Sequence, residues 1–293
     1  MNDNHYHKNH HYKPGLYYGL TFLLTSVFWL AGAYASRTEA FVDLYFALML
    51  PGLLAPFLIT LVMTFASGNR ALKRDYLRRL FDLRLIRLST LPSLLLLMPL
   101  VVLASALISL LAGGSVSQFQ PAEGFSFSYG IVSALTVLLL AATFEELGWR
   151  GYAFDSLQSR YNYLTASIIF GALWSAWHLP LILVKGSYQY EILRQSPWYA
   201  VNFYVGTVFL GVIISWFCAK NRKSVPAAIL FHFIINMSQE FLAITQLTKT
   251  IETGVLALVT VAIVLTERDL FFSRAHRGQA AVETAGADAA VPA

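Results

Sequence analysis

The sequence predicts an all-α membrane protein that crosses the bilayer about eight times. Of its 293 residues, 57% are hydrophobic and only 13% are charged. The apolar residues come in runs of about twenty, the length at which a helix spans roughly 30 Å of hydrocarbon. Inside a bilayer the backbone must satisfy its own hydrogen bonds, which a helix does within a single segment. Run length and composition together therefore define a polytopic helical class.

The predicted spans follow one another along the chain. The first could instead be a signal peptide, because Ala33-Tyr34-Ala35 mimics a cleavage site, but its apolar core exceeds the usual length of about 7 to 15 residues. We therefore expect a retained helix. The eighth span is the weakest, since it is short and opens with Glu252 and Gly254. The eight spans are expected near residues 16–35, 42–66, 91–113, 127–147, 163–184, 198–219, 226–246 and 251–266.

Lysine and arginine residues gather on one side of these spans. With eight spans, 17 of the 21 lie on the side of the N-terminus, against Arg37, Lys185, Arg194 and Lys249 on the other. The positive-inside rule then places both termini in the cytoplasm. The short loops favour the cytoplasmic membrane of a bacterium, as a multi-pass protein. Because the net charge of +5 follows the cytoplasmic loops, we expect membrane lipids rather than nucleic acid as partners.

Four regions are expected: a His-rich tail at 1–15, N-terminal helices with a basic connector at 16–123, a transmembrane core with the polar motifs at 124–267, and an Ala-rich tail at 268–293. The connector has leucines at helical spacing among basic residues, which fits an interfacial amphipathic helix or a solvated connector equally well. A single cysteine, Cys218, excludes an intrachain disulfide. The N-terminal tail carries His5, His7, His10 and His11.

Ionisable side chains within the spans are the candidates for function, since they are costly in hydrocarbon. Together with one asparagine they form a short set: Glu145, Glu146, Arg150, His178, His232, Asn236 and Glu240.

Helix geometry divides the first three of these residues. Glu146 and Arg150 are four residues apart in the favourable acid-first order, so they are expected to pair. Glu145 is rotated by about 100° from Glu146 and lacks that partner. We therefore expect Glu146 and Arg150 to brace the helix and Glu145 to be the reactive carboxylate.

The two histidines come from different spans. His178 lies one turn after Trp174 and just before Pro180, which loosens the backbone hydrogen bonding there. His232 and Asn236 are four residues apart and share a helical face, which Glu240 continues. Imidazoles and a carboxylate from three helices form a cluster suited to activating water.

These motifs resemble the CPBP family, the CAAX prenyl protease and bacteriocin-processing (Abi) intramembrane endopeptidases. The first family motif, two glutamates with an arginine four residues after the second, matches Glu145-Glu146-x-x-x-Arg150. The second, an aromatic residue with a histidine four later, matches Trp174 and His178, although the family usually has Phe at the aromatic position. The third, His-x-x-x-Asn, matches residues 232 and 236. The likeness covers roughly residues 125–245.

The resemblance implies a protease that hydrolyses a peptide bond in the membrane, with a membrane-associated or lipidated peptide or protein as substrate. Glu145 would be the general base, and His178 would hold the attacking water. His232 and Asn236 would donate hydrogen bonds to the oxyanion, a role whose loss costs about 100- to 1,000-fold in rate. Trp174 would affect substrate fit or packing.

Whether a metal takes part is open at this stage. Two neutral histidines and a carboxylate match a catalytic zinc shell, which makes His178, His232 and Glu145 candidate zinc ligands of a metalloprotease. The ligands lack the compact HExxH spacing, however, and a glutamate in an apolar site could activate water unaided.

Helix lengths also predict the shape of the site. Counted from the cytoplasmic side, His232 lies about 9 Å and His178 about 22 Å along their helices. The cluster closes only if the fifth helix begins near Tyr161 or tilts strongly, around a hydrated cavity that we expect to open to the cytoplasm. The alternatives to an enzyme are a non-catalytic scaffold or bacteriocin self-immunity protein, and a proton-coupled transporter, for which the chain shows no repeated half.

Overall fold

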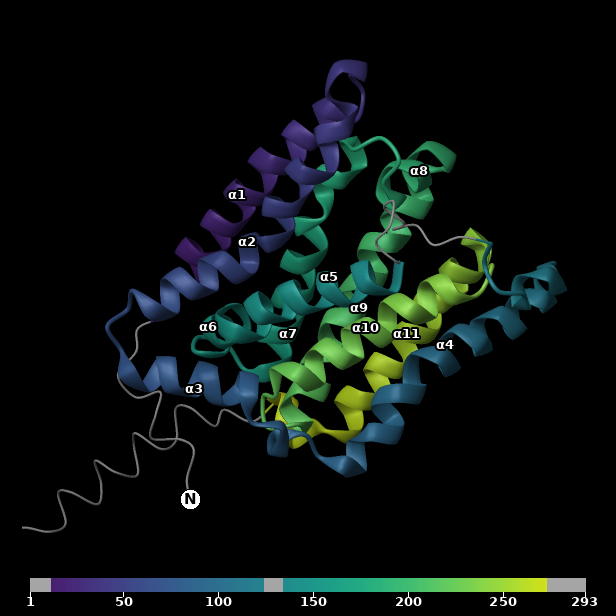
Figure 1. Cartoon of the computed structure of the whole chain (residues 1–293). Helices are drawn as coiled ribbons and strands as arrows, with labels where there is room; N and C mark the ends of the chain where they lie inside the picture. The colour runs from purple at the N-terminus through teal and green to yellow at the C-terminus, as the bar shows by residue number, and fades with distance from the viewer. Residues whose placement is uncertain (1–11, 124–133, 273–293) are drawn as a thin grey trace, which may run out of the picture.

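A computed structural model describes residues 12–123 and 134–272 of the chain, and this part is helical (Figure 1). Within it no strand occurs, and one isolated bridge joins Pro121 to Leu242. The predicted His-rich tail up to residue 11, the C-terminal tail from residue 273 and the start of the fourth predicted span lie outside the described residues. The helices are α1 (Pro14–Ala35), α2 (Tyr45–Phe65), α3 (Arg70–Phe81), α4 (Leu91–Leu111), α5 (Ala134–Gly148), α6 (Phe154–Gln158), α7 (Tyr163–Trp177), α8 (Tyr188–Gln195), α9 (Pro197–Lys220), α10 (Val225–Phe241), α11 (Gln246–Thr266) and α12 (Arg268–Phe272).

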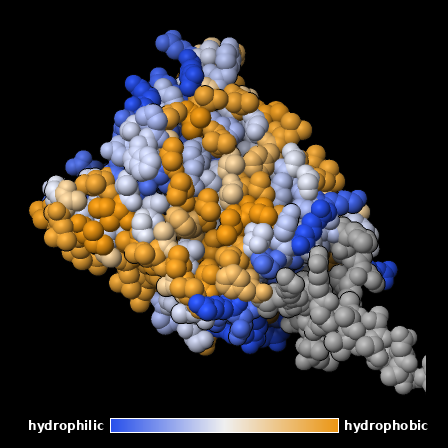
Figure 2. Space-filling view, turned by 180° about the vertical axis from the view of Figure 1, so that it is seen from behind, coloured by the Kyte–Doolittle hydropathy of each residue, from blue (hydrophilic) through white to orange (hydrophobic). Residues whose placement is uncertain are grey.

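The all-α polytopic membrane class is confirmed. Within the described residues, six helical segments are long and apolar enough to cross a bilayer: residues 14–35, 39–65, 88–111, 163–183, 197–220 and 246–266. The count of eight is not confirmed, because α5 has 15 residues in the described part of the chain and α10 has 17. Figure 2 shows a broad apolar surface on one face of the molecule, with hydrophilic side chains toward its edges.

Several helix ends differ from the sequence prediction, and α10 ends at Phe241, five residues before the predicted end of the seventh span. The helix α11 begins at Gln246, five residues before the predicted start, because Thr245 caps it and Glu252 is buried inside the protein. The fifth span narrows after Trp177 into a 3₁₀ turn over Leu179–Leu183. Pro180 lies in that turn and has no N–H to continue an α-helix.

Glycines set the closest contacts between helices around the site. A Cβ at Gly171 of α7 would lie 2.6 Å from the carbonyl oxygen of Val208 in α9, and a Cβ at Gly211 would lie 2.5 Å from the Cα of Gly171. A Cβ at Gly148, where α5 ends, would collide with the backbone of Pro56 in α2. Small residues allow such close backbone approach in membrane helices, so α7 meets α9 and α5 meets α2 at fixed points.

The basic connector docks on the bundle through a buried arginine. Arg79 of α3 is 3% exposed, and its guanidinium contacts Asp155 at 2.8 Å and Asp75 at 2.9 Å. It also donates to the carbonyl oxygens of Arg150 and Gly151. Burial alone would lower the pKa of Arg79, but the two carboxylates hold it above its usual value. The connector is therefore part of the fold as well as a surface helix.

The carbonyls that Arg79 binds belong to a π-helical turn, Trp149–Ala153, between α5 and α6. Turns of this kind are rare and are frequent at functional sites. Here the turn directly follows the two adjacent glutamates, so α3 supports the end of the helix that carries them.

Candidate active site

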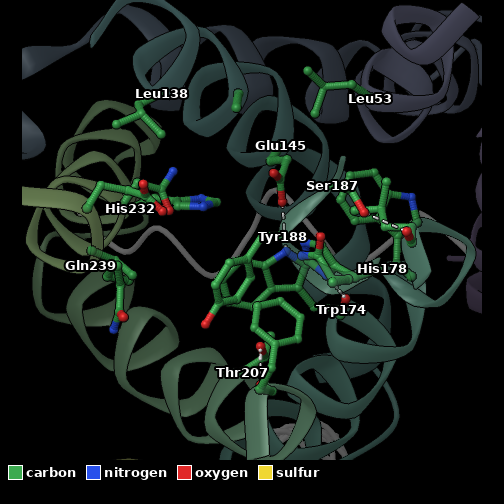
Figure 3. A pocket seen from close by; sticks show the side chains of 18 of the residues that line it. Leu53, Leu138, Glu145, Trp174, His178, Ser187, Tyr188, Thr207, His232 and Gln239 are labelled. Atoms are coloured by element: carbon green, nitrogen blue, oxygen red, sulfur yellow. Dashed lines mark hydrogen bonds between the residues drawn. The ribbon is translucent and has the colours of Figure 1, made fainter. Parts of the chain in front are cut away.

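A cavity of about 490 Å³ lies among α1, α2, α5, α7, α9, α10 and α11, and its lining includes five of the predicted site residues (Figure 3). Glu145 comes from α5, and Trp174 and His178 come from the end of α7. His232 and Asn236 come from α10 and face the cavity together, as their four-residue spacing predicts. Figure 3 shows His232 on one side of the cavity and Trp174 with His178 on the other. The structure thus brings the three motifs to one place.

Glu145 is buried, with 5% of its surface exposed, yet it lines the cavity. Its Oε2 accepts a hydrogen bond from the indole Nε1 of Trp174 at 2.7 Å and a longer one from Trp149 at 3.4 Å. Both donors act on the same carboxylate oxygen. The second oxygen, Oε1, is left to interact with a molecule in the cavity.

Glu146 and Arg150 form the predicted ion pair, with 2.9 Å between Arg150 Nε and Glu146 Oε2. Glu146 Oε1 also lies 2.9 Å from the Nδ1 of His232, a contact that the sequence did not predict. Arg150 donates in addition to the hydroxyl of Ser215 and lies 4.2 Å from the ring centroid of Phe170. All the contacts of Glu146 are made behind the cavity, so Glu146 holds His232 in place and does not face the cavity itself.

Hydrogen-bond partners determine which nitrogen each imidazole offers to the cavity. The Nδ1 of His178 lies 2.8 Å from the carbonyl oxygen of Trp174, which can only accept, so Nδ1 carries the proton and a neutral His178 has an acceptor at Nε2. An ionised Glu146 can likewise only accept, so Nδ1 of His232 is protonated too. If His232 is an imidazolium, its Nε2–H can donate into the cavity.

Charge balance favours that imidazolium. Glu146 pairs with both Arg150 and His232, and Glu145 also interacts electrostatically with His232, so a positive His232 would balance the second carboxylate of the buried group. Buried charges are stable only when they are paired.

Asn236 and Glu240 continue the α10 face along the cavity wall. In the part of the chain that the structure describes, no hydrogen bond fixes the Asn236 amide. This amide is therefore available to donate to a ligand in the cavity.

Zinc binding by Glu145, His178 and His232 stays a prediction. Across residues 12–123 and 134–272, no three His, Cys, Asp or Glu side chains lie close enough together to hold a metal ion. Glu145 and His178 each use one ligating atom in a hydrogen bond to or from Trp174. These hydrogen bonds leave Oε1 of Glu145 and Nε2 of His178 to interact with a molecule in the cavity.

Three features of the site were missed by sequence reasoning. The sequence predicts a role in packing or substrate fit for Trp174, but its indole donates a hydrogen bond to the Glu145 carboxylate. The Glu146–His232 contact joins residues 86 apart in sequence, and no pattern in one sequence reports such a distance. In the sequence, Glu252 indicates only that the eighth predicted span is the weakest. In the structure it is 2% exposed and lines the same cavity.

The cavity extends away from α3. It is lined by the first turns of α2 and α11, the ends of α7 and α10, and the segment around Tyr188 that enters α8. Figure 1 shows α8 and the α1–α2 connection at one end of the bundle and α3 at the other. The α8 end is the one that the charge distribution places outside. The sequence predicts both cytoplasmic termini and a cavity that opens to the cytoplasm. In this structure the cavity lies toward the end of the bundle opposite α3, so only one of these two predictions can hold.

Comparison with known proteins defines the class. The family model described as Type II CAAX prenyl endopeptidase Rce1-like matches residues 126–238, which include every motif residue. The chain is 56% identical over 263 residues to CAAX prenyl protease 2 of Methanococcus maripaludis, covering 90% of this chain and 97% of that protein. It is 24% identical over 210 residues to lysostaphin resistance protein A of Staphylococcus haemolyticus, covering 72% of this chain and 53% of that protein.

The helical bundle with its buried polar cavity is a multi-pass membrane protease. The chain belongs to the Rce1-like CAAX prenyl endopeptidase family, as the motif resemblance predicted.

Proposed function

We propose that this protein is an intramembrane endopeptidase that cleaves membrane-associated or lipidated peptides with water activated by Glu145. The observation that carries the proposal is the position of the Glu145 carboxylate, which lines a cavity with one oxygen held by Trp174. The name of the Methanococcus protein supports a substrate with a prenylated cysteine near its C-terminus. The many apolar side chains from α2, α5 and α9 in the cavity wall suit such a chain.

In the proposed reaction a water molecule lies between Glu145 Oε1 and His178 Nε2. Glu145 takes one proton as the water oxygen bonds to the scissile carbonyl carbon, and the carbonyl π electrons move onto the carbonyl oxygen. Asn236 and the Nε2–H of His232 donate hydrogen bonds to that oxyanion. The intermediate then collapses, the C–N bond breaks, and Glu145 returns its proton to the leaving nitrogen. Protons and charge balance over the cycle, and no step uses a metal.

Glu146 and Arg150 support this reaction without touching the substrate. An ionised Glu146 keeps His232 protonated and fixes its ring, which the oxyanion role requires. Arg150 compensates the charge of Glu146.

The test is cleavage of a synthetic peptide with an S-prenylated cysteine and three further residues, by purified protein in proteoliposomes. We expect wild-type protein to release the C-terminal fragment and Glu145→Gln protein to release none. Equal cleavage by both proteins would refute the proposal.

A second candidate is a bacteriocin self-immunity protein or a non-catalytic scaffold, which the name of the Staphylococcus relative favours. A scaffold needs the fold but not the carboxylate. Protection of cells that was unchanged by Glu145→Gln would support the scaffold.

A further inference from the structure

The catalytic cavity contains a second polar cluster beyond Asn236. It consists of Gln239 on α10, Lys249 and Glu252 on α11, and Tyr188 at the start of α8, all of which line the cavity. The amide of Gln239 donates a hydrogen bond to Oε1 of Glu252. The Lys249 ammonium lies 4.5 Å from the ring centroid of Tyr188. The proposed hydrolysis uses none of these four side chains.

The charges of this cluster are only partly satisfied. Among the described residues, no carboxylate lies within ion-pair distance of the Lys249 ammonium. Glu252 is almost fully buried, and in the described chain its only side-chain hydrogen bond engages Oε1, so Oε2 has no donor. Lys249 is half-buried and interacts electrostatically with Glu252 without a direct ion pair, so it can still pair with an anion in the cavity. The open oxygen of the buried Glu252 costs free energy unless a donor pairs with it.

Helix geometry relates the cluster to the reacting bond. His232 and Gln239 share one wall of the cavity (Figure 3). They are seven residues apart on α10, or about 10 Å along its axis. An extended peptide advances by about 3.3 Å per residue, so about three residues cover the same distance. A chain whose scissile carbonyl lies at His232 would place the third residue after the cut beside Gln239.

We propose that Lys249 and Glu252 bind the C-terminal residue of the substrate. Lys249 pairs with the free terminal carboxylate, and Oε2 of Glu252 accepts the backbone N–H of the same residue. Lys249 and Glu252 are three residues apart and therefore lie on one face of α11. One terminal residue can then place its carboxylate at Lys249 and its backbone N–H at Glu252. Lys249 also lies in the first turn of α11, where the helix dipole favours an anion.

This inference rests on the proposed peptidase function and narrows it. A site that binds a free terminus about three residues beyond the cut selects substrates cleaved near their C-terminal ends. Internal peptide bonds of longer chains would be poor substrates, because no carboxylate would reach Lys249.

The experiment compares two S-prenylated peptides that differ only in the C-terminal group, a free acid in one and a carboxamide in the other. The carboxamide keeps the backbone N–H and loses the charge. We expect wild-type protein in proteoliposomes to favour the acid by about 10- to 100-fold in kcat/KM, the effect of one charge-assisted hydrogen bond. Lys249→Met should lower cleavage of the acid to that of the amide, and Lys249→Arg should keep part of the preference.

Two further variants serve as controls. Lys185→Met removes an exposed lysine that is absent from the cavity wall and should keep the full preference. Glu252→Gln should weaken cleavage of both peptides, because both carry the N–H, and should not lower the acid-to-amide ratio, because it removes a negative charge beside Lys249. Thermal unfolding of each purified variant, compared with wild type, identifies a loss of fold.

The outcomes separate the two proposals. If wild-type protein cleaves the acid and the amide equally, or if Lys249→Met lowers both in proportion, the terminal-residue site is refuted and the peptidase function stands. If wild-type protein cleaves neither peptide, the proposed function fails and this inference fails with it.

Discussion

The indole Nε1 of Trp174 on α7 donates a 2.7 Å hydrogen bond to the carboxylate of Glu145 on α5, and the two residues are 29 positions apart in the sequence. A hydrogen bond of this length fixes the orientation of the carboxylate. The same residue uses its carbonyl oxygen to accept from the Nδ1 of His178. One tryptophan therefore orients both groups that are proposed to hold the attacking water.

Replacing Trp174 by Phe should slow catalysis while preserving the fold. Phenylalanine keeps most of the apolar volume and the backbone carbonyl but has no N–H. Losing a hydrogen bond to a charged group costs about 1.5 to 3 kcal/mol, so we expect kcat to fall about 10- to 100-fold with KM nearly unchanged. Trp198→Phe, at a residue 60% exposed, is the matched control and should retain full activity. An unchanged kcat for Trp174→Phe would show that the hydrogen bond is not used.

The two adjacent glutamates should respond differently to the same substitution. Glu145→Gln should reduce cleavage by at least about 100-fold, as expected for a lost general base, with little change in thermal stability, because glutamine still accepts from Trp174. Glu146→Gln should cost about 3 kcal/mol of unfolding free energy, since it leaves Arg150 buried without its counter-charge. Peptide cleavage and thermal unfolding of both variants test this. A larger stability loss for Glu145→Gln would reverse the two roles.

Removing metal should leave the peptidase active. We expect protein treated with 1,10-phenanthroline to keep its rate, because among the described residues no three His, Cys, Asp or Glu side chains are grouped closely enough to hold a metal ion. Elemental analysis should use protein without residues 1–11, so that metal bound by the N-terminal histidines is not counted. His232→Gln, which retains a donor, should keep part of the activity. Inhibition reversed by stoichiometric zinc would establish a metal mechanism instead.

Membrane orientation decides which compartment the cavity faces. Reporters fused after residues 88 and 222 should share one side and a reporter after residue 119 should lie on the other. From the excess of Lys and Arg, we expect the first two to be cytoplasmic. The cavity would then open to the opposite side of the membrane. An external reporter at residue 88 would reverse the orientation and direct the cavity to the cytoplasm.

Much of this architecture could be predicted from the sequence because its signals are local. Apolar runs of span length define the class, and four-residue spacings place Glu146 with Arg150 and His232 with Asn236. Each of these relationships depends only on the pitch of one helix.

The rest depends on contacts between helices, which one sequence does not report. The direction of the cavity depends on which helix ends line it, and the burial of Glu252 depends on the contact between α11 and α10, where Gln239 donates to it. The role of Trp174 requires knowing that α7 crosses close to α5. Its position in a motif indicates that an aromatic residue belongs there, but not that its N–H meets a carboxylate.

Gly148 of α5 lies directly against the backbone of Pro56 of α2, and a rocking motion of one helix on the other would pivot at this contact. Thr60 of α2 donates a hydrogen bond to the carbonyl of Gly148, and Phe57 packs on Phe144 nearby. Further from the pivot, Met49 of α2 and Val137 of α5 line the cavity. Val137 lies eleven residues from Gly148, a lever of about 16 Å. A rotation of about 10° at the pivot would move Val137 by about 3 Å, which is most of the width of a hydrocarbon chain. The absence of a side chain at Gly148 thus lets α2 and α5 meet closely enough that a small rocking motion would widen the passage for an apolar substrate.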